Sequence, residues 1–345
     1  MVVKLAMDTN WVNRCKGIAI IGILLYHYLD FFLTGLPKKI VTGGGQGVHI
    51  FFILSAFGLT LSLSRARKIY WRDWYFKRFV KLLIPYYISV GIILLSLFIA
   101  HKGGLNLGVI SATIFLYRGF VGRYVMAINP TWWFVITILE FYLIFPILLW
   151  LFRRFRFSFV FCALVINVLF QYFYASVLKT ENLVFARFFL CFIFEFSLGI
   201  YLADIFVKNK DHFWNSLTSR KAVILGLSCE AIGIYLAFNG SLGKAYNDIF
   251  NGIGFSLLVL NIDYFLARFK YYSVVMSAVG KYSLAIFLLH APYIGIFFGN
   301  FKGTGFANAL LFLVPYCLFV TALSLVFTKL ILQKTPLLKN YFSSI

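Results

Sequence analysis

Histidines, glutamates and arginines interrupt long apolar runs in this sequence, and these side chains are the most able to do chemistry. His27, Glu140 and His290 each lie several residues inside such a run. Histidine titrates near neutral pH, so it can take a proton from a hydroxyl and pass it on. An ionisable group in an apolar span is costly and is by default a functional hypothesis. The simpler alternative is a buried side chain with a hydrogen-bonded partner. The same choice applies to Asp30, His49, Arg187, Glu195, Glu230 and Lys281.

A basic run follows the second apolar stretch. It begins at Arg65–Lys68 and continues through Lys77 and Arg78 to Lys81. Arg78 and Lys81 are three residues apart, so on a helix they share one face, and we predict that a helix starts at residue 79. Two cations at a helix start are a credible site for the phosphates of a phosphorylated donor. Anionic lipid headgroups explain the run equally well, and topology signalling explains most of it.

The composition indicates that these groups lie in a membrane protein. Hydrophobic residues make up 62% of the 345 residues and charged residues 12%, against about 45–50% and about 25% in soluble proteins. The mean hydropathy is +0.89. A soluble fold of this length would need far more charge on its surface. The sequence therefore predicts an all-α, polytopic transmembrane helical bundle, and it excludes a cytosolic enzyme, a disordered chain and a secreted disulfide scaffold.

About ten apolar stretches have a length that can cross a bilayer. We predict spans at residues 17–33, 48–63, 79–100, 132–152, 157–177, 183–206, 222–238, 249–266, 274–298 and 307–330. A shorter run at 107–116 is predicted not to span. With this topology most of the 32 Lys and Arg residues fall on the inner side, as the positive-inside rule requires, so both termini are predicted to be cytoplasmic. Residues 1–345 contain no long linker, and we expect a single transmembrane domain.

The net charge and the cysteine content limit the ligands and partners that the sequence predicts. A net charge of +21 would suggest nucleic acid in a soluble protein, but membrane topology explains it here, and no nucleic-acid partner is expected. The five cysteines are scattered and include no C-x-x-C pair, so neither a metal site nor a disulfide framework is predicted. The glycine stretch at 42–47 matches no nucleotide-binding pattern.

Five segments, in order along the chain, resemble motifs of the acyltransferase-3 family of integral membrane acyltransferases. They are N-R-C-K-G-I-A at 13–19 with His27, G-V-H-I-F-F-I-L-S-A-F at 47–57, F-K-R-F-V-K-L-L-I-P at 76–85, W-W-F at 132–134 with Glu140 and Pro146, and G-K-Y-S at 280–283 with His290 and Pro292. The sequence departs from the family pattern in four places: Lys16 and Lys81 replace arginine, and Asn13 and His49 replace aspartate. Lysine keeps the charge but loses the bidentate fork of arginine.

The resemblance implies transfer of an acyl group, usually acetyl, from a cytosolic coenzyme A thioester to a hydroxyl. The co-substrate would be acetyl-CoA or another acyl-CoA, without a metal. The acceptor would be a surface or lipid-linked carbohydrate at the cell inner or plasma membrane, with membrane lipid around the protein. On this sequence the resemblance assigns His27 as the base or acyl-accepting group and Glu140 as a second catalytic candidate. It assigns Lys16, Arg78 and Lys81 to the donor phosphates.

A multi-span transporter or flippase is the alternative function, because buried His and Glu side chains also form proton relays. Such a protein would be expected to show repeat symmetry between its halves, which the sequence lacks. Direct transfer and transfer through an acyl-enzyme both stay open. The identity of the sugar, a homodimeric state, and the roles of His49 and His290 stay open as well.

Overall fold

The computed structural model describes residues 9–41, 45–64, 66, 68–101, 106–177 and 187–332. This part of the chain is almost entirely helical and contains no strand. Nine of its helical segments are long and apolar enough to cross a membrane. The protein is therefore an all-α, polytopic helical membrane bundle, as the composition predicts.

The long helices agree with most of the predicted spans. They are α1 (Asn10–Phe32), α3 (Gly47–Ser64), α4 (Trp71–Ile99), α7 (Trp133–Phe155), α8 (Phe157–Tyr172), α9 (Ile193–Lys208), α12 (Gly240–Leu266), α14 (Ser283–Phe298) and α15 (Phe306–Val326). The predicted span at 222–238 is α11 (Arg220–Ala237), which has 18 residues but carries three charges. The predicted start at 183 lies outside the described residues. Both the cytoplasmic placement of the termini and the single domain stay predictions.

Shorter helices connect the long ones. They are α2 (Gly35–Val41), α5 (Leu107–Ile114), α6 (Gly122–Val125), α10 (Lys210–Leu217) and α13 (Lys270–Lys281), with short 3-10 or π segments at Tyr117–Phe120, Phe173–Val177, Phe189–Phe192, Gly299–Phe301 and Phe327–Leu332. The prediction that the run at 107–116 does not span is confirmed, because α5 has only 8 residues.

The predicted span at 274–298 is wrong, since it consists of two helices. The amphipathic α13 ends at Lys281 and α14 starts at Ser283. At Gly280 a β-carbon would overlap the carbonyl oxygen of Asn13, so α13 lies against the backbone of α1. Lys281 is consequently exposed at a helix end and is no longer a charge inside a span.

The predicted helix start at residue 79 is also wrong. α4 begins at Trp71, with Asp73 in its first turn, where the helix dipole favours an acidic residue. Arg78 and Lys81 therefore lie in the helix interior, where backbone N–H groups already bond to carbonyls four residues earlier. The expected help from a helix N-terminus in binding an anion is lost. The two cations still share one face.

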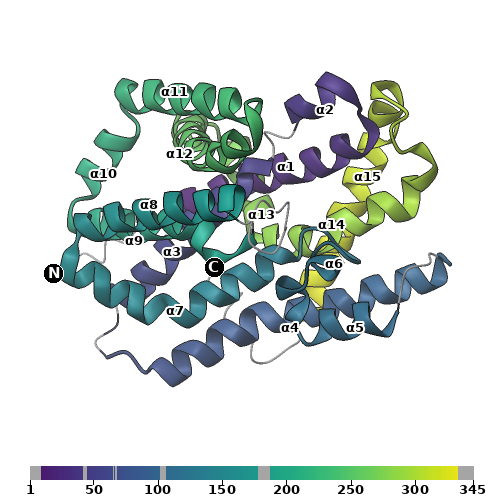
Figure 1. Ribbon diagram of the computed structural model, residues 1–345, viewed down its shortest axis with the longest axis horizontal. Coiled ribbons are helices and arrows are strands. Elements are labelled where there is room, and N and C mark those ends of the chain that lie inside the picture. The colour runs from purple at the N-terminus through teal and green to yellow at the C-terminus, as the bar shows by residue number, and fades with distance from the viewer. Residues whose placement is uncertain are drawn as a thin grey trace.

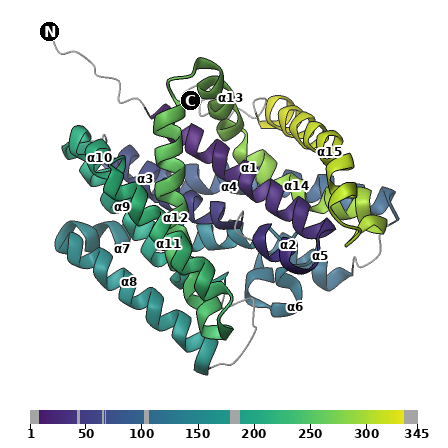
Figure 2. The same ribbon diagram turned by 90° about the horizontal axis from the view of Figure 1, so that it is seen from above.

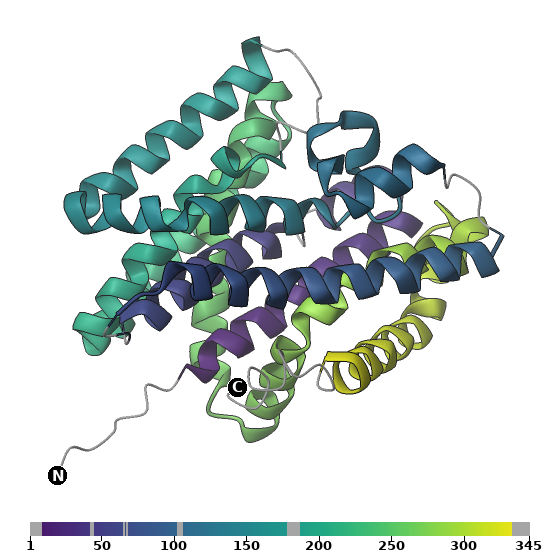
Figure 3. The same cartoon turned by 90° about the horizontal axis from the view of Figure 1, so that it is seen from below.

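α1 runs through the interior of the bundle, and the other helices surround it (Figures 1 and 2). It packs against α3, α12, α13, α14 and α15. Glycine permits two of these contacts: a β-carbon at Gly17 would overlap the carbonyl of Met276, and one at Gly47 would overlap the carbonyl of Ala19. On one side α11 packs on α12, and the long α4 runs with α5 along the opposite side (Figures 1 and 3).

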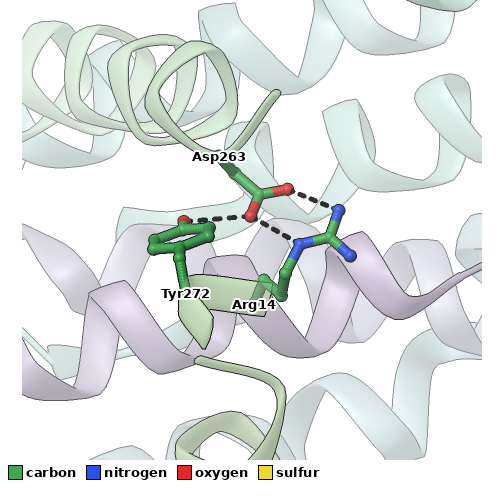
Figure 4. Close-up of polar contacts among 3 residues, drawn as sticks. All are labelled: Arg14, Asp263 and Tyr272. Carbon is green, nitrogen blue, oxygen red and sulfur yellow. Dashed lines mark hydrogen bonds and ion pairs between the residues drawn. The ribbon is translucent and has the colours of Figure 1, made fainter. Parts of the chain in front are cut away.

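A buried ion pair fixes the first turns of α1. Arg14 donates from Nε and Nη2 to Oδ1 and Oδ2 of Asp263 on α12, at 2.8 and 3.0 Å. Tyr272 on α13 donates to Oδ1 of the same carboxylate at 3.0 Å (Figure 4). Burial, and then the carboxylate, raise the pKa of Tyr272, so its hydroxyl stays a donor. A bidentate pair tolerates little rotation, and it therefore sets the orientation of α1 against α12 and α13.

A proline explains how the segment before α7 is tied to α14. Pro292 has no N–H, so the carbonyl of Leu288 lacks its helical partner. The side-chain amide of Asn129 and the indole N–H of Trp132 both donate to that oxygen at 3.0 Å. The fully buried Arg118 holds the same segment by donating to three backbone carbonyls between residues 125 and 129. These bonds position the stretch of α14 that carries His290.

Candidate active site

A cavity of about 1350 Å³ lies among α1, α3, α7, α11 and α12. Four of the ionisable residues singled out in the sequence line it: His27, His49, Arg187 and Glu230. Two more lie directly behind these: His290 is next to His27, and Glu195 is next to His49. Residues from helices far apart in the sequence thus form one polar site inside an apolar bundle.

His27 lines this cavity from α1. Its ring centroid lies 4.6 Å from that of Tyr26 and 5.3 Å from that of His290. The side chain is partly buried, so it can meet a substrate in the cavity while its second face rests on protein. This is the placement that a general base requires.

His290 is fully buried on α14 beside His27. Its Nδ1 lies 2.9 Å from the carbonyl oxygen of Ile286 and 3.1 Å from that of Phe287. Carbonyl oxygens only accept, so Nδ1 carries the hydrogen and Nε2 carries a lone pair. That Nε2 is buried and makes no hydrogen bond within the described residues. The tertiary structure therefore places a second proton acceptor next to His27.

His49 forms a second pair, with Glu195. Its Nδ1 lies 2.8 Å from Oε1 of Glu195, whose side chain is fully buried. Gly252 makes room for the ring, since a β-carbon there would lie 2.9 Å from Nδ1. The carboxylate accepts the hydrogen on Nδ1 and so fixes the tautomer of the ring. The substitution of His49 for the family aspartate thus comes with a carboxylate from another helix.

Arg187 supplies a cation to the same cavity. The hydroxyl of Thr137 on α7 donates to the carbonyl of Arg187 at 2.6 Å, which fixes its backbone. The guanidinium lies 4.4 Å from the ring centroid of Trp133, where the ring face attracts a cation. The Nε of Arg187 is buried without a hydrogen-bond partner among the described residues. It is available to a substrate group that carries negative charge.

Glu140, the second predicted catalytic residue, is not among the residues that line the cavity. Its Oε2 accepts the backbone N–H of Phe189 at 3.0 Å, at the start of the short helical turn that leads into α9. This contact satisfies a backbone donor that has no partner inside a helix. A catalytic role for Glu140 stays a prediction.

The three predicted donor-phosphate contacts come together at the other end of α1. Lys16 on α1 lies within electrostatic reach of Arg78 on α4, and Lys81 lies within reach of both. Arg78 donates to the hydroxyl of Ser62 at 3.1 Å and lies 5.8 Å from the ring of Trp74. Neither contact neutralises its charge. The grouping of these cations supports the predicted anion site but does not test it.

The sequence matches the acyltransferase domain family Acyl_transf_3 over residues 9–329. The chain belongs to this family. The matched region includes every residue of the cavity and of the cationic group, so the protein is a membrane acyltransferase with several spans. No curated protein and no solved structure matched the sequence.

In this acyltransferase Lys16 and His27 lie on one face of α1. They are eleven residues apart, which is about three helical turns and roughly 16 Å. Ile20 and Ile23 occupy the same face between them, and both are fully buried. Ile23 lines the cavity, whereas Ile20 does not. The packed side chain of Ile20 therefore lies between the cavity and the cationic group.

The sequence did not indicate that Gln46, Asn247, Asp248 and Asn251 line the cavity of the acyltransferase. Three of them are uncharged amides, which give a weaker signal in an apolar run than ionisable groups do. Asp248 lies just before the predicted span at 249–266, but α12 starts at Gly240 and carries it into the bundle. A longer predicted helix would have found it.

Proposed function

We propose that this acyltransferase moves an acyl group, acetyl in the simplest case, from cytosolic acyl-CoA to a hydroxyl of a surface or lipid-linked carbohydrate at the inner or plasma membrane. The observation that carries the proposal is the arrangement along α1. One face of that helix presents a base, His27, in a polar cavity and a cation, Lys16, in a group of three. These are the two components that acyl transfer from a phosphorylated thioester needs.

The cationic group suits the donor. The positive charges of Lys16, Arg78 and Lys81 act on one another, and a bound phosphate would relieve that repulsion. Arg78 can bind phosphate through two parallel N–H groups, whereas the two lysines act as point charges. The predicted topology puts this group at the cytoplasmic side, where acyl-CoA is found. The long pantetheine arm would then extend along α1 past Ile20 towards His27.

The cavity suits a sugar. Aromatic rings of Tyr26, Trp133 and Tyr174 line it together with amides and carboxylates, and this mixture offers both ring faces and hydrogen bonds. Its volume exceeds the roughly 300–1000 Å³ of most small-molecule sites, so it could hold more than one sugar unit. In the predicted topology the loops at its mouth face outward, where surface glycans are assembled.

In the proposed reaction His27 takes the proton of the acceptor hydroxyl as the oxygen attacks the thioester carbonyl carbon. A carbon–oxygen bond forms, the carbon–sulfur bond breaks, and the proton passes from His27 to the departing sulfur. The products are the ester and free coenzyme A. Arg187 would stabilise the negative charge that develops on the carbonyl oxygen. The lone pair on Nε2 of His290 would accept a hydrogen bond from the second N–H of protonated His27 and so stabilise the positive charge.

The test uses full-length purified protein with labelled acetyl-CoA and a mixture of oligosaccharides. We expect base-labile label on the sugar, and its rate of appearance should fall about 10²–10⁴-fold in the His27→Ala variant. Retained full activity in that variant would remove His27 from the mechanism. Binding of acetyl-CoA should weaken in Arg78→Gln. If neither donor binding nor label transfer occurs, and liposomes holding the protein take up a solute, the transporter alternative replaces the proposal.

A further inference from the structure

We infer that one wall of the cavity is a subsite for a sugar unit that carries a free amine. This wall, called the polar wall here, consists of Gln46, Glu230, Asn247, Asp248 and Asn251. The inference rests on the proposed function, because it specifies the carbohydrate that the acyltransferase takes. It concerns recognition of the acceptor and is independent of the role of His27.

The polar wall is rich in hydrogen-bond acceptors that lack donors. The side-chain oxygens Oε1 of Gln46, Oε1 of Glu230 and Oδ1 of Asn247 and Asn251 are buried and make no hydrogen bond within the described part of the chain. Gln46 is 8% exposed and Asn251 is 4% exposed, and both line the cavity. Buried acceptors are costly unless a donor reaches them. The wall therefore fits a ligand that presents several donors.

The charges favour a cationic ligand over an acidic one. The wall carries two carboxylates, Glu230 and Asp248. Arg187 and Asp248 act with opposite sign on the same two side chains, Tyr26 and Tyr174, so Arg187 is a counter-charge for Asp248. Glu230 lies within electrostatic reach of His49, but that imidazole already pairs with Glu195 at 2.8 Å. One carboxylate of the wall is left without a strong cation among these side chains.

Among the described side chains that line the cavity, Lys39 is the other cation, and it does not alter this balance. It is exposed on α2, with its Nζ 5.7 Å from the ring centroid of Phe238. Water screens a charge at such a position more than it screens a buried one. Glu230, by contrast, is partly buried with one oxygen that has no contact with solvent.

The wall calls for hydrogen-bond donors and for a positive charge. An ammonium group supplies both, since it carries one positive charge and three N–H donors and accepts no hydrogen bond. A hydroxyl brings one donor and no charge. A uronic acid would place a second anion beside Glu230, which is unfavourable in a site of low dielectric. The amine of a hexosamine would therefore lie against Glu230 and the amides of Asn247 and Asn251. A hydroxyl of the same or the neighbouring unit would face His27.

The experiment compares three acceptors of equal length with the purified full-length enzyme: chitosan oligosaccharides, their N-acetylated counterparts and oligogalacturonate. The rate of base-labile acetyl transfer separates O-acylation from N-acylation. We expect kcat/KM for the amine form to exceed that for the N-acetylated form at least tenfold, with the acid lowest. Equal values, or the highest value for the acid, would overturn the inference while the proposed function stands.

A variant links the preference to the wall. Glu230→Gln keeps the shape of the side chain and should bring the ratio of amine to N-acetylated acceptor close to one. Asp211→Asn, which removes an exposed carboxylate on α10, should leave the ratio unchanged. If the ratio of kcat/KM for the amine acceptor to that for the N-acetylated acceptor is unchanged in Glu230→Gln, the polar wall is not the cause of the preference.

Binding of the sugar in the absence of acyl-CoA tests the amine subsite separately from the proposed acyltransferase reaction. Quenching of tryptophan fluorescence by chitosan oligosaccharides reports occupancy, because Trp133 lines the cavity. Quenching that weakens at least tenfold in Glu230→Gln supports the subsite, even if no acceptor is acylated and the proposed function fails. Equal affinity for the amine and N-acetylated forms, or no binding of either, would overturn it.

Discussion

The two ends of α1 differ in the kind of polar environment they form. Around His27 the cavity mixes cations, carboxylates and amides and has a volume of about 1350 Å³. Around Lys16 three cations of one sign gather on α1 and α4, and the fully buried Ile20 lies between this group and the cavity. Mixed polarity suits a sugar, whereas charge of one sign suits phosphates. Under the proposed function, one helix would serve two ligands of different chemistry, and they would enter from opposite sides.

The largest effect is expected at the cavity end. His27→Ala should lower the rate of acyl transfer by about 10²–10⁴-fold, the usual contribution of a general base, while the affinity for acyl-CoA stays the same. Labelled transfer and equilibrium binding of the donor measure the two quantities. His212→Ala, an exposed histidine on α10, is the control. If both variants transfer acyl groups at the normal rate, the cavity end has no catalytic function.

The orientation of α1 against its neighbours should depend on the ion pair of Figure 4. Asp263→Asn removes the carboxylate charge that pairs with the buried Arg14, and removing one partner of such a pair typically costs about 3–5 kcal/mol of stability. Thermal unfolding in detergent measures this change. Asp204→Asn breaks a partly exposed pair with Arg156 and Lys208 and should cost about 0–1 kcal/mol. Equal losses for the two variants would show that the buried pair does not hold α1.

The separation between the two ends should depend on the size of residue 20. Ile20→Trp adds volume to a fully buried position on the path from cations to cavity; overpacking of this kind costs about 1–3 kcal/mol. We expect transfer to fall at least tenfold, with sugar binding intact. Ile21→Trp, at a position that is 36% exposed, should transfer normally. Normal rates in Ile20→Trp would mean that the donor reaches His27 by another route.

The cationic group of Lys16, Arg78 and Lys81 should affect binding of acyl-CoA and not binding of the sugar. Arg78→Gln should raise KM for acyl-CoA about tenfold, which corresponds to about 1.4 kcal/mol, with little change in kcat or in KM for the sugar. Lys77→Gln, an exposed neighbour on α4, is the matched control. A change confined to the KM of the sugar would move the donor site away from this end.

The smallest effect is expected at Glu140, outside both ends. Glu140→Gln removes the charge but keeps an oxygen that can accept the N–H of Phe189. We expect transfer within about twofold of normal, measured with the same labelled assay. A loss of tenfold or more would instead support the catalytic role that the sequence resemblance implies.

Much of the candidate site could be predicted from the free-energy cost of placing ionisable side chains in apolar spans. A charge or an imidazole inside an apolar run is retained for a reason, and by this rule the sequence singled out His27, His49, Arg187, Glu195, Glu230 and His290. The same rule failed at Lys281, because Tyr282 separates two helices that read as one apolar run. It did not find Asn251 or Gln46, because an uncharged amide costs less than an ion in an apolar run.

The sequence by itself determined the fold class, the family and most of the helices, since an apolar run of about 20 residues has few alternatives in a bilayer. Only the tertiary structure decided which polar residues meet. The pairing of His49 with Glu195, the free lone pair of His290 and the separation of Lys16 from His27 by Ile20 all join or divide residues according to how helices rotate and pack. Those rotations depend on contacts such as Arg14 with Asp263, which are 249 residues apart in the chain. No local pattern in a sequence records a contact of that kind.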